Sequence, residues 1–324
     1  MRKIVSLLLL LLSFIVTAQK SAEDFGFQHL KLEYKKQVVD ILIQTKKGEE
    51  TKKKPIFFWC QGSLPQPVIK YDEKGIYGTF PFNPDDFLNE FHLVIVGKPG
   101  VPVISEVSKL NQNYTYTDES GKTPDNYNNN NFPDYYVNRN NWIIGKLIKL
   151  PMFSDKKLVV SGHSEGSSIA AKMASENTKI THLIYSGGNP YGRIMSILAQ
   201  SRYYDSDNNT IEYWKEVVEN KNDLITEEGD SFKTTYDFSV PVSEKLEKIK
   251  IPVLITYGTK DWNAAYNDLF YVEAIRKQLK NITFIPMIGL EHNYFPVNEK
   301  MEPNHAVYNW EDVGKQWAKW LTNN

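Results

Sequence analysis

A serine between two glycines is the part of the sequence best suited to chemistry. The segment Gly162-His163-Ser164-Glu165-Gly166 follows a short apolar run at 158–161 and precedes a run of small residues at 167–174. A sharp turn between a strand and a helix presents a serine oxygen above a sheet, with the N–H groups of the helix N-terminus close by. Glycines two positions before and after that serine relieve contacts with the neighbouring backbone. We therefore predict that Ser164 is a nucleophile.

A serine hydroxyl attacks efficiently only when a base removes its proton and an acid holds that base. Asp261 follows the apolar run 253–257, and His292 follows the apolar run 282–288, so both come just after a predicted strand. The carboxyl ends of parallel strands meet at one edge of an open α/β sheet, where functional side chains collect. The chain therefore offers His292 as the general base and Asp261 as the acid that orients it.

Each of these assignments has an alternative. The five-residue serine motif arises by chance in about one chain in ten of this length, and then marks only a glycine-flanked turn. Asp261 has a turn or helix-capping role as its alternative, with Asp268 and Glu291 as the nearest substitutes. His305, which lies in a polar segment, is the main rival of His292 as the base.

Short apolar runs predict the sheet that must position these side chains. Such runs, continuous as in strands buried on both faces, occur at 55–60, 91–96, 158–161, 181–186, 253–257 and 282–288. A hairpin is predicted at 30–34 and 38–45, a polar surface loop over 111–141, and helices from near Tyr135 to before Pro151 and over 307–321. Strands that alternate with helical segments indicate an α/β fold with a mostly parallel central sheet flanked by helices.

The segment 189–248 is longer than a single crossover between neighbouring strands requires. It contains helix-like stretches at 193–204 and 211–220. We predict that it forms a helical insertion, or lid, before the strand that leads to Asp261.

The reactive motifs together resemble those of α/β-hydrolase fold enzymes. The resemblance covers most of residues 30–322 and rests on the serine motif at 162–166, on Gly258-Thr259-Lys260-Asp261 and on Gly289-Leu290-Glu291-His292. It implies the α/β-hydrolase fold and a Ser–His–Asp triad.

The resemblance also implies an oxyanion hole built from backbone N–H groups. The family takes one donor from the residue after the nucleophile, here Glu165, and the other from a loop after an early strand. That loop is Gln61-Gly62-Ser63, with Ser63 as the donor and with Gln61 where the family more often has histidine. Each such donor stabilises the oxyanion by about 3 to 4 kcal/mol.

Five residues near strand ends are predicted to line the substrate pocket. A core or surface position is the alternative for the aromatic ones. The five are Gln61, Gly62, Tyr135, Tyr136 and Trp262.

The composition limits the classes of partner. The chain has 324 residues with 38 Lys and Arg against 39 Asp and Glu, a net charge of −1. This balance gives no general attraction to phosphate backbones, so we do not expect nucleic acid binding. The single cysteine, Cys60, excludes an internal disulfide and a thiolate zinc site, and we predict that it is a small buried apolar residue. We expect neither a metal nor an organic cofactor.

Residues 1–18 have the features of a signal peptide. Arg2 and Lys3 precede an apolar run at 4–16 and a small-residue pattern at 16–18. The apolar run is shorter than the roughly 20 residues of a membrane span, although an uncleaved anchor is the alternative. We predict export to the periplasm or the medium and a mature hydrolase domain over 19–324, without a stable membrane anchor.

These predictions combine into one leading hypothesis with alternatives. The leading hypothesis is an exported serine hydrolase that cleaves a carboxylic ester of a small or acylated molecule through an acyl-enzyme on Ser164. Cleavage of a peptide, an amide or a thioester uses the same groups. The alternative of another class is a non-catalytic binding protein that retains the fold.

Overall fold

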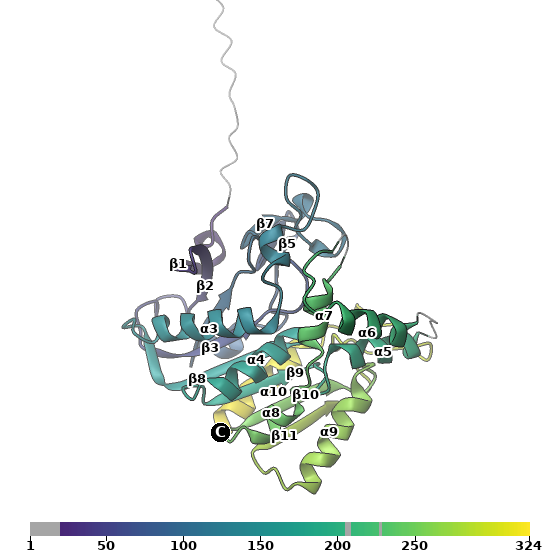
Figure 1. Ribbon diagram of the computed structural model, residues 1–324. Helices are drawn as coiled ribbons and strands as arrows, with labels where there is room; N and C mark the ends of the chain where they lie inside the picture. Colours follow the sequence, from purple (N-terminus) through teal and green to yellow (C-terminus); the bar gives the residue numbers. More distant parts are fainter. Residues whose placement is uncertain (1–19, 205–208, 227–228) are drawn as a thin grey trace, which may run out of the picture.

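The structure is a computed structural model that describes residues 20–204, 209–226 and 229–324 (Figure 1). The segment 1–18, for which the sequence predicts a signal peptide, lies outside the described residues. Within the described residues, no helix combines the length and the hydrophobicity that crossing a membrane requires.

Eight strands form one sheet in the order β1-β2-β6-β3-β8-β9-β10-β11. Neighbouring strands from β6 to β11 are parallel, and β2 is antiparallel to both of its neighbours. The sheet is therefore mostly parallel, as predicted. Its strands are β1 (Phe27–Tyr34), β2 (Gln37–Gln44), β3 (Lys54–Cys60), β6 (His92–Val96), β8 (Phe153–His163), β9 (His182–Ser186), β10 (Val253–Gly258) and β11 (Ile282–Met287).

The central strands are apolar on both sides because helices cover both faces of the sheet. Ile56 and Phe58 of β3 pack into one core, whereas Phe57 and Trp59, which alternate with them, pack into a second core on the opposite face. Successive side chains of a strand point to opposite faces, so a strand between two helical layers has no polar face. This arrangement explains why continuous apolar runs predicted the strands.

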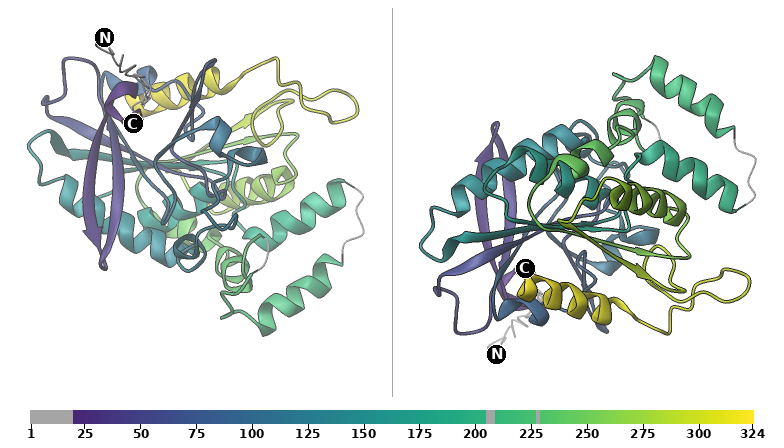
Figure 2. Two further views of the ribbon diagram at one scale, coloured as in Figure 1. Left: turned by 90° about the horizontal axis from the view of Figure 1, so that it is seen from above. Right: turned by 90° about the horizontal axis from the view of Figure 1, so that it is seen from below.

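One face is covered by α3, α4, α8 and α9, and the other by α1 and α10 (Figure 2). The repeated apolar residues of α10 form a buried stripe, in which Trp317 packs on Trp59 of β3 with 6.3 Å between ring centres. The bounds of these helices are α1 (Asp85–Leu88), α3 (Pro133–Leu147), α4 (Glu165–Glu176), α8 (Ser243–Lys248), α9 (Ala264–Arg276) and α10 (Trp310–Asn323).

The segment 189–248 contributes three more helices before α8, namely α5 (Arg193–Tyr203), α6 (Thr210–Glu219) and α7 (Phe232–Phe238). These three contact one another and project beside the sheet (Figures 1 and 2). Helix α8 instead contacts α4, and its Leu246 belongs to the core of the first face. Phe238, the last residue of α7, belongs to the same core. Helices α5 and α6 therefore lie outside the layered core, and α8 is part of the helical layer.

Several short elements were not predicted from the sequence. A second sheet has the order β5-β4-β7, with β4 (Ile69–Asp72), β5 (Gly75–Gly78) and β7 (Ile104–Glu106). These strands are too short to show an alternating pattern. The predicted loop over 111–141 contains the short helix α2 (Asp125–Asn128) and gives way to α3 at Pro133. The remaining short helices are η1 (Glu23–Phe25), η2 (Val107–Lys109) and η3 (Gln112–Tyr114).

Candidate active site

Ser164 occupies the turn between β8 and α4. Its backbone has φ 55° and ψ −127°, and its N–H donates a hydrogen bond of 2.9 Å to the carbonyl oxygen of Ser186 on β9. A positive φ is unfavourable for a residue with a side chain, so the surrounding structure must hold this conformation. The turn places Ser164 at the carboxyl edge of the sheet, directly before the N-terminus of α4.

The glycines on either side of Ser164 permit close approach of the backbone. A Cβ atom on Gly166 would lie 2.2 Å from the carbonyl oxygen of Cys60, and one on Gly162 would lie 2.2 Å from that of Gly166. Real Cβ atoms do not come so close to backbone atoms. The turn, α4 and the end of β3 are therefore packed at a distance that only glycine allows.

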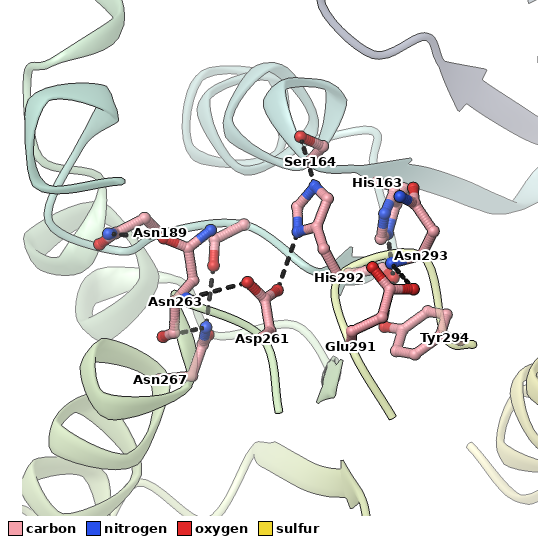
Figure 3. Close-up of polar contacts among 12 residues, drawn as sticks. His163, Ser164, Asn189, Asp261, Asn263, Asn267, Glu291, His292, Asn293 and Tyr294 are labelled. Carbon is pink, nitrogen blue, oxygen red and sulfur yellow. Dashed lines mark hydrogen bonds and ion pairs between the residues drawn. The ribbon is translucent and has the colours of Figure 1, made fainter. Parts of the chain in front are cut away.

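Ser164, His292 and Asp261 are joined by hydrogen bonds (Figure 3). Nε2 of His292 lies 3.1 Å from Oγ of Ser164, and Nδ1 lies 2.8 Å from Oδ2 of Asp261. Ser164 follows β8, Asp261 lies in the loop after β10 and His292 lies in the loop after β11. All three therefore lie at the carboxyl edge of the sheet, as the sequence predicted. The second oxygen of Asp261 accepts a hydrogen bond of 2.9 Å from the N–H of Asn263, which fixes the carboxylate.

The imidazole of His292 is buried beside a carboxylate. Burial opposes protonation, but the charge of Asp261 and its hydrogen bond favour the imidazolium more strongly, with a smaller contribution from Glu291. The pKa of His292 is therefore raised above its ordinary value. A base that is held this way keeps a defined orientation and accepts a proton readily.

A second imidazole, that of His163, lies next to the first but stays uncharged. The ring centres of His163 and His292 are 5.0 Å apart. Nδ1 of His163 lies 2.9 Å from Oγ of Ser186, which in turn lies 2.7 Å from the hydroxyl of Tyr294. Burial, together with the neighbouring His292, lowers the pKa of His163 well below its ordinary value. Of the two imidazoles, that of His292 is therefore the one whose protonation the site favours.

The rival residues lie in other environments. Asp268 accepts a hydrogen bond from the hydroxyl of Tyr257, and Glu291 accepts hydrogen bonds from the N–H groups of Asn293 and Phe295. His305 packs its ring against Phe295, with 4.6 Å between ring centres. Among the described residues, none of the three forms a hydrogen bond with Ser164, whereas His292 does, so the geometry favours Asp261 and His292.

Two cavities meet at Ser164. One, of about 340 Å³, lies toward the insertion and is lined by Glu165, Arg193, Asp230 and Trp262 among others. The second, of about 370 Å³, lies toward the loop after β3 and is lined by Gln61, Gly62 and Trp310 among others. Ser63, Ser164 and His292 line both cavities. A substrate bound at the serine therefore has room on both sides of its reacting bond.

The loop after β3 is held in place by two side-chain hydrogen bonds, one from Gln61 and one from Tyr127, a residue that the sequence analysis did not single out. Nε2 of Gln61 donates a hydrogen bond of 2.6 Å to the carbonyl oxygen of Val96, and the hydroxyl of Tyr127 donates one of 2.5 Å to that of Ser63. Glu165 is the first residue of α4, so its backbone N–H has no acceptor within the helix. Both predicted oxyanion donors, Ser63 and Glu165, thus lie on segments beside Ser164.

The aromatic residues predicted for the pocket separate into two groups. The ring of Trp262 stacks on the imidazole of His292, at 4.6 Å and 26°. Tyr135 and Tyr136 are instead buried in the core, where Tyr135 packs against Tyr34. They are absent from the lining of both cavities at Ser164, so the prediction for these two residues is corrected. Both side chains lie on the face of α3 that packs against the sheet.

Other residues confirm or extend the sequence reading. Cys60 is buried, as predicted, and burial raises the pKa of its thiol. Arg193 and Asp230, which line one cavity, were missed because no motif marks them within the insertion.

Within the described residues, no group of three or more His, Cys, Asp or Glu side chains is arranged to hold a metal ion.

The described fold is similar to those of solved structures, although no protein-family model and no curated protein matches the sequence. Acylaminoacyl peptidase of Pyrococcus horikoshii has a TM-score of 0.53 and 14% identity over 92% of this chain and 40% of its own. 2,6-Dihydroxy-pseudo-oxynicotine hydrolase has a TM-score of 0.55 and 14% identity over 93% of this chain and 70% of its own. Est1E of Butyrivibrio proteoclasticus has a TM-score of 0.51 and 11% identity over 91% of this chain and 98% of its own.

The chain thus spans about 40% of the length of the peptidase and nearly all of Est1E. Identities this low carry information about architecture and not about substrate. The similarity agrees with the mostly parallel eight-stranded sheet between two helical layers. The chain has the α/β-hydrolase fold.

Proposed function

We propose that the protein is a serine hydrolase that cleaves a carboxylic ester through an acyl-enzyme on Ser164. The observation that carries the proposal is the pair of hydrogen bonds that joins Asp261 to His292 at 2.8 Å and His292 to Ser164 at 3.1 Å. These bonds lie where two cavities meet, so a bound ester would present its carbonyl carbon to the serine oxygen.

In the first half of the reaction, Oγ of Ser164 attacks the carbonyl carbon while Nε2 of His292 takes the hydroxyl proton. The carbonyl oxygen becomes an oxyanion, which the N–H groups of Ser63 and Glu165 would stabilise. The imidazolium that forms is paired with Asp261. The bond to the alcohol then breaks, and His292 gives the proton to the leaving oxygen.

In the second half, water attacks the acyl-enzyme. Nε2 of His292 takes a proton from the water, and the acid leaves when Ser164 recovers its proton. The two cavities supply separate space for the acyl part and for the alcohol, and the water enters where the alcohol has left.

Amide, peptide and thioester bonds are the alternatives for the same groups. The similar structures include peptidases and a thioesterase domain. A panel of ester, anilide and thioester substrates with one acyl group compares kcat/KM directly. We expect the ester to have a higher kcat/KM than the anilide. The ratio of the two should exceed the ratio of their rate constants in alkaline hydrolysis.

Labelling with a fluorophosphonate tests the activated serine without knowledge of the substrate. We expect a single modification at Ser164, located by mass spectrometry, because the reagent loses fluoride when an activated serine oxygen attacks its phosphorus. The labelled chain would cover 19–324, and Ser164→Ala is the control. A folded protein that takes no label would favour the non-catalytic binding protein.

The pH dependence of kcat/KM reports the base. We expect the rate to fall as the pH decreases through the pKa of His292, because the imidazolium cannot accept the serine proton. Asp261 and Glu291 raise this pKa, so the midpoint of the acidic limb should lie above the ordinary histidine value of about 6.5. A profile of 4-nitrophenyl acetate hydrolysis from about pH 5 to pH 9 measures it. A midpoint below the ordinary value would contradict the assignment.

We also propose that the protein is exported. Support comes from the charged start, apolar run and small-residue pattern of residues 1–18. Expression of the full chain in a bacterium, followed by fractionation and N-terminal mass spectrometry, should give an extracytoplasmic protein that begins near Gln19. A cytoplasmic product that retains Met1 would overturn this part of the proposal.

A further inference from the structure

A buried ion pair lies beside the proposed nucleophile. The carboxylate of Glu165, the residue after Ser164, pairs with the guanidinium of Arg193 on α5. The side chain of Glu165 is only 4% exposed and that of Arg193 14% exposed. Both line the cavity of about 340 Å³ that also contains Ser164 and His292. The charge of Glu165 is therefore part of the electrostatic environment of the reaction.

Arg193 is the group that compensates this carboxylate. Within the described residues, Arg193 is the ion-pair partner of Glu165, and neither carboxylate oxygen accepts a hydrogen bond from any other group. The N-terminus of α4 also favours a negative side chain, but only weakly. A buried carboxylate without a partner is unfavourable, and its field acts strongly on nearby charge because little water screens it.

The position of Arg193 is itself fixed by the insertion. Its guanidinium pairs with Asp230, which precedes α7, and lies 4.5 Å from the ring centre of Phe238 on α7. Asp230 in turn accepts a hydrogen bond of 3.0 Å from Asn131. The insertion therefore places the guanidinium of Arg193, held by Asp230 and Phe238, beside the first turn of α4.

We propose that Arg193 is a positioning residue that acts through Glu165. The proposal rests on the proposed function, in which the N–H of Glu165 stabilises the oxyanion. Negative charge develops on the substrate oxygen next to this residue, and an unpaired carboxylate on the same residue would repel it. Arg193 cancels that repulsion and holds the first turn of α4. The insertion thereby completes the electrostatics of the site in addition to forming a wall of its cavity.

The test compares the rate constant of fluorophosphonate labelling at Ser164 with kcat/KM for 4-nitrophenyl acetate, both at about pH 8. Arg193→Met should slow both by about 10- to 100-fold, as expected for the unpaired charge of Glu165 at roughly 6 to 12 Å and an effective dielectric constant near 20. Arg193→Lys, which keeps the charge, should lose less.

The decisive variant is the double substitution Glu165→Gln with Arg193→Met. It removes the carboxylate of Glu165 together with its partner and leaves Asp230 unpaired in both variants, so it should recover the part of the lost rate that the charge of Glu165 causes. A purely structural role of Arg193 predicts no such recovery. Arg202→Met is the matched control, since Arg202 is an exposed residue near the end of the same helix, and it should behave as wild type.

Two results would overturn the inference. One is a wild-type rate in Arg193→Met, and the other is a double variant as slow as the single one. If Arg193→Met does not fold, as judged by thermal unfolding, the comparison of Arg193→Lys and the double variant with wild type decides. Failure of the wild-type protein to label at all would instead contradict the proposed function, so the two failures are distinguishable.

Discussion

Ser164→Ala is expected to abolish turnover, with a loss in kcat on the order of a million-fold. The substitution removes the oxygen that attacks the substrate and leaves His292 without the proton it is placed to take, at 3.1 Å. The remaining rate would come from substrate binding and from the backbone donors of the oxyanion hole, which water can still use. Steady-state hydrolysis of 4-nitrophenyl acetate, with enzyme in large excess over any contaminant, measures the loss.

Ser175→Ala is the matched control for this substitution. Ser175 lies on the same helix, α4, where its hydroxyl is exposed and donates to the carbonyl oxygen of Lys172. Its removal should leave kcat within about twofold of wild type, since exposed substitutions are usually nearly neutral. Comparable activity of the two alanine variants would refute Ser164 as the nucleophile.

Asp261→Asn should lower kcat about ten-thousand-fold. Asp261 is buried and accepts a hydrogen bond from Nδ1 of His292, at 2.8 Å. An amide can donate its own N–H to that nitrogen, which favours the tautomer whose Nε2 carries a proton and cannot act as a base. The loss of the negative charge also removes the main cause that raises the pKa of His292. The small residual activity should therefore have its acidic limb at lower pH than wild type.

Asp268→Asn provides the comparison, because Asp268 follows the same strand, β10, but pairs with the hydroxyl of Tyr257. Its kcat should remain close to that of wild type. A pH–rate profile of both variants shows whether a slow enzyme has lost the interaction between Asp261 and His292, which shifts the acidic limb, or is slow for another reason. An Asp261→Asn variant with an unshifted acidic limb would show that Asp261 does not interact with the catalytic base.

Prediction from sequence succeeded where burial is two-sided. The strands β3, β6, β9 and β10 appear in the sequence as short continuous apolar runs, because helices cover both faces of the sheet. Helix α9 was missed because Leu269, Val272 and Ile275 on its outer side are exposed. Apolar residues on both the inner and the outer side hide the helical period, so no pattern marked the segment.

The site was predictable where a residue follows a strand and unpredictable where tertiary packing decides. Ser164, Asp261 and His292 each follow a recognisable strand, and the structure brings them together. Tyr135 and Tyr136 belong to a helix whose rotation about its axis is set by packing, and they turned into the core. Arg193 reaches Glu165 only through the placement of α5, which depends on contacts among the insertion helices.

The hydrogen bond between His292 and Ser164 joins residues 128 positions apart in the chain. The turn between β8 and α4 is held by contacts with β9 and β3, yet the serine in it remains an ordinary alcohol until β10 and β11 have joined the sheet. Contacts between residues far apart in the chain carry a loop-closure entropy cost that local contacts avoid. Reactivity of Ser164 therefore measures completion of the sheet, and its recovery during refolding reports the arrival of the two strands synthesised after the insertion.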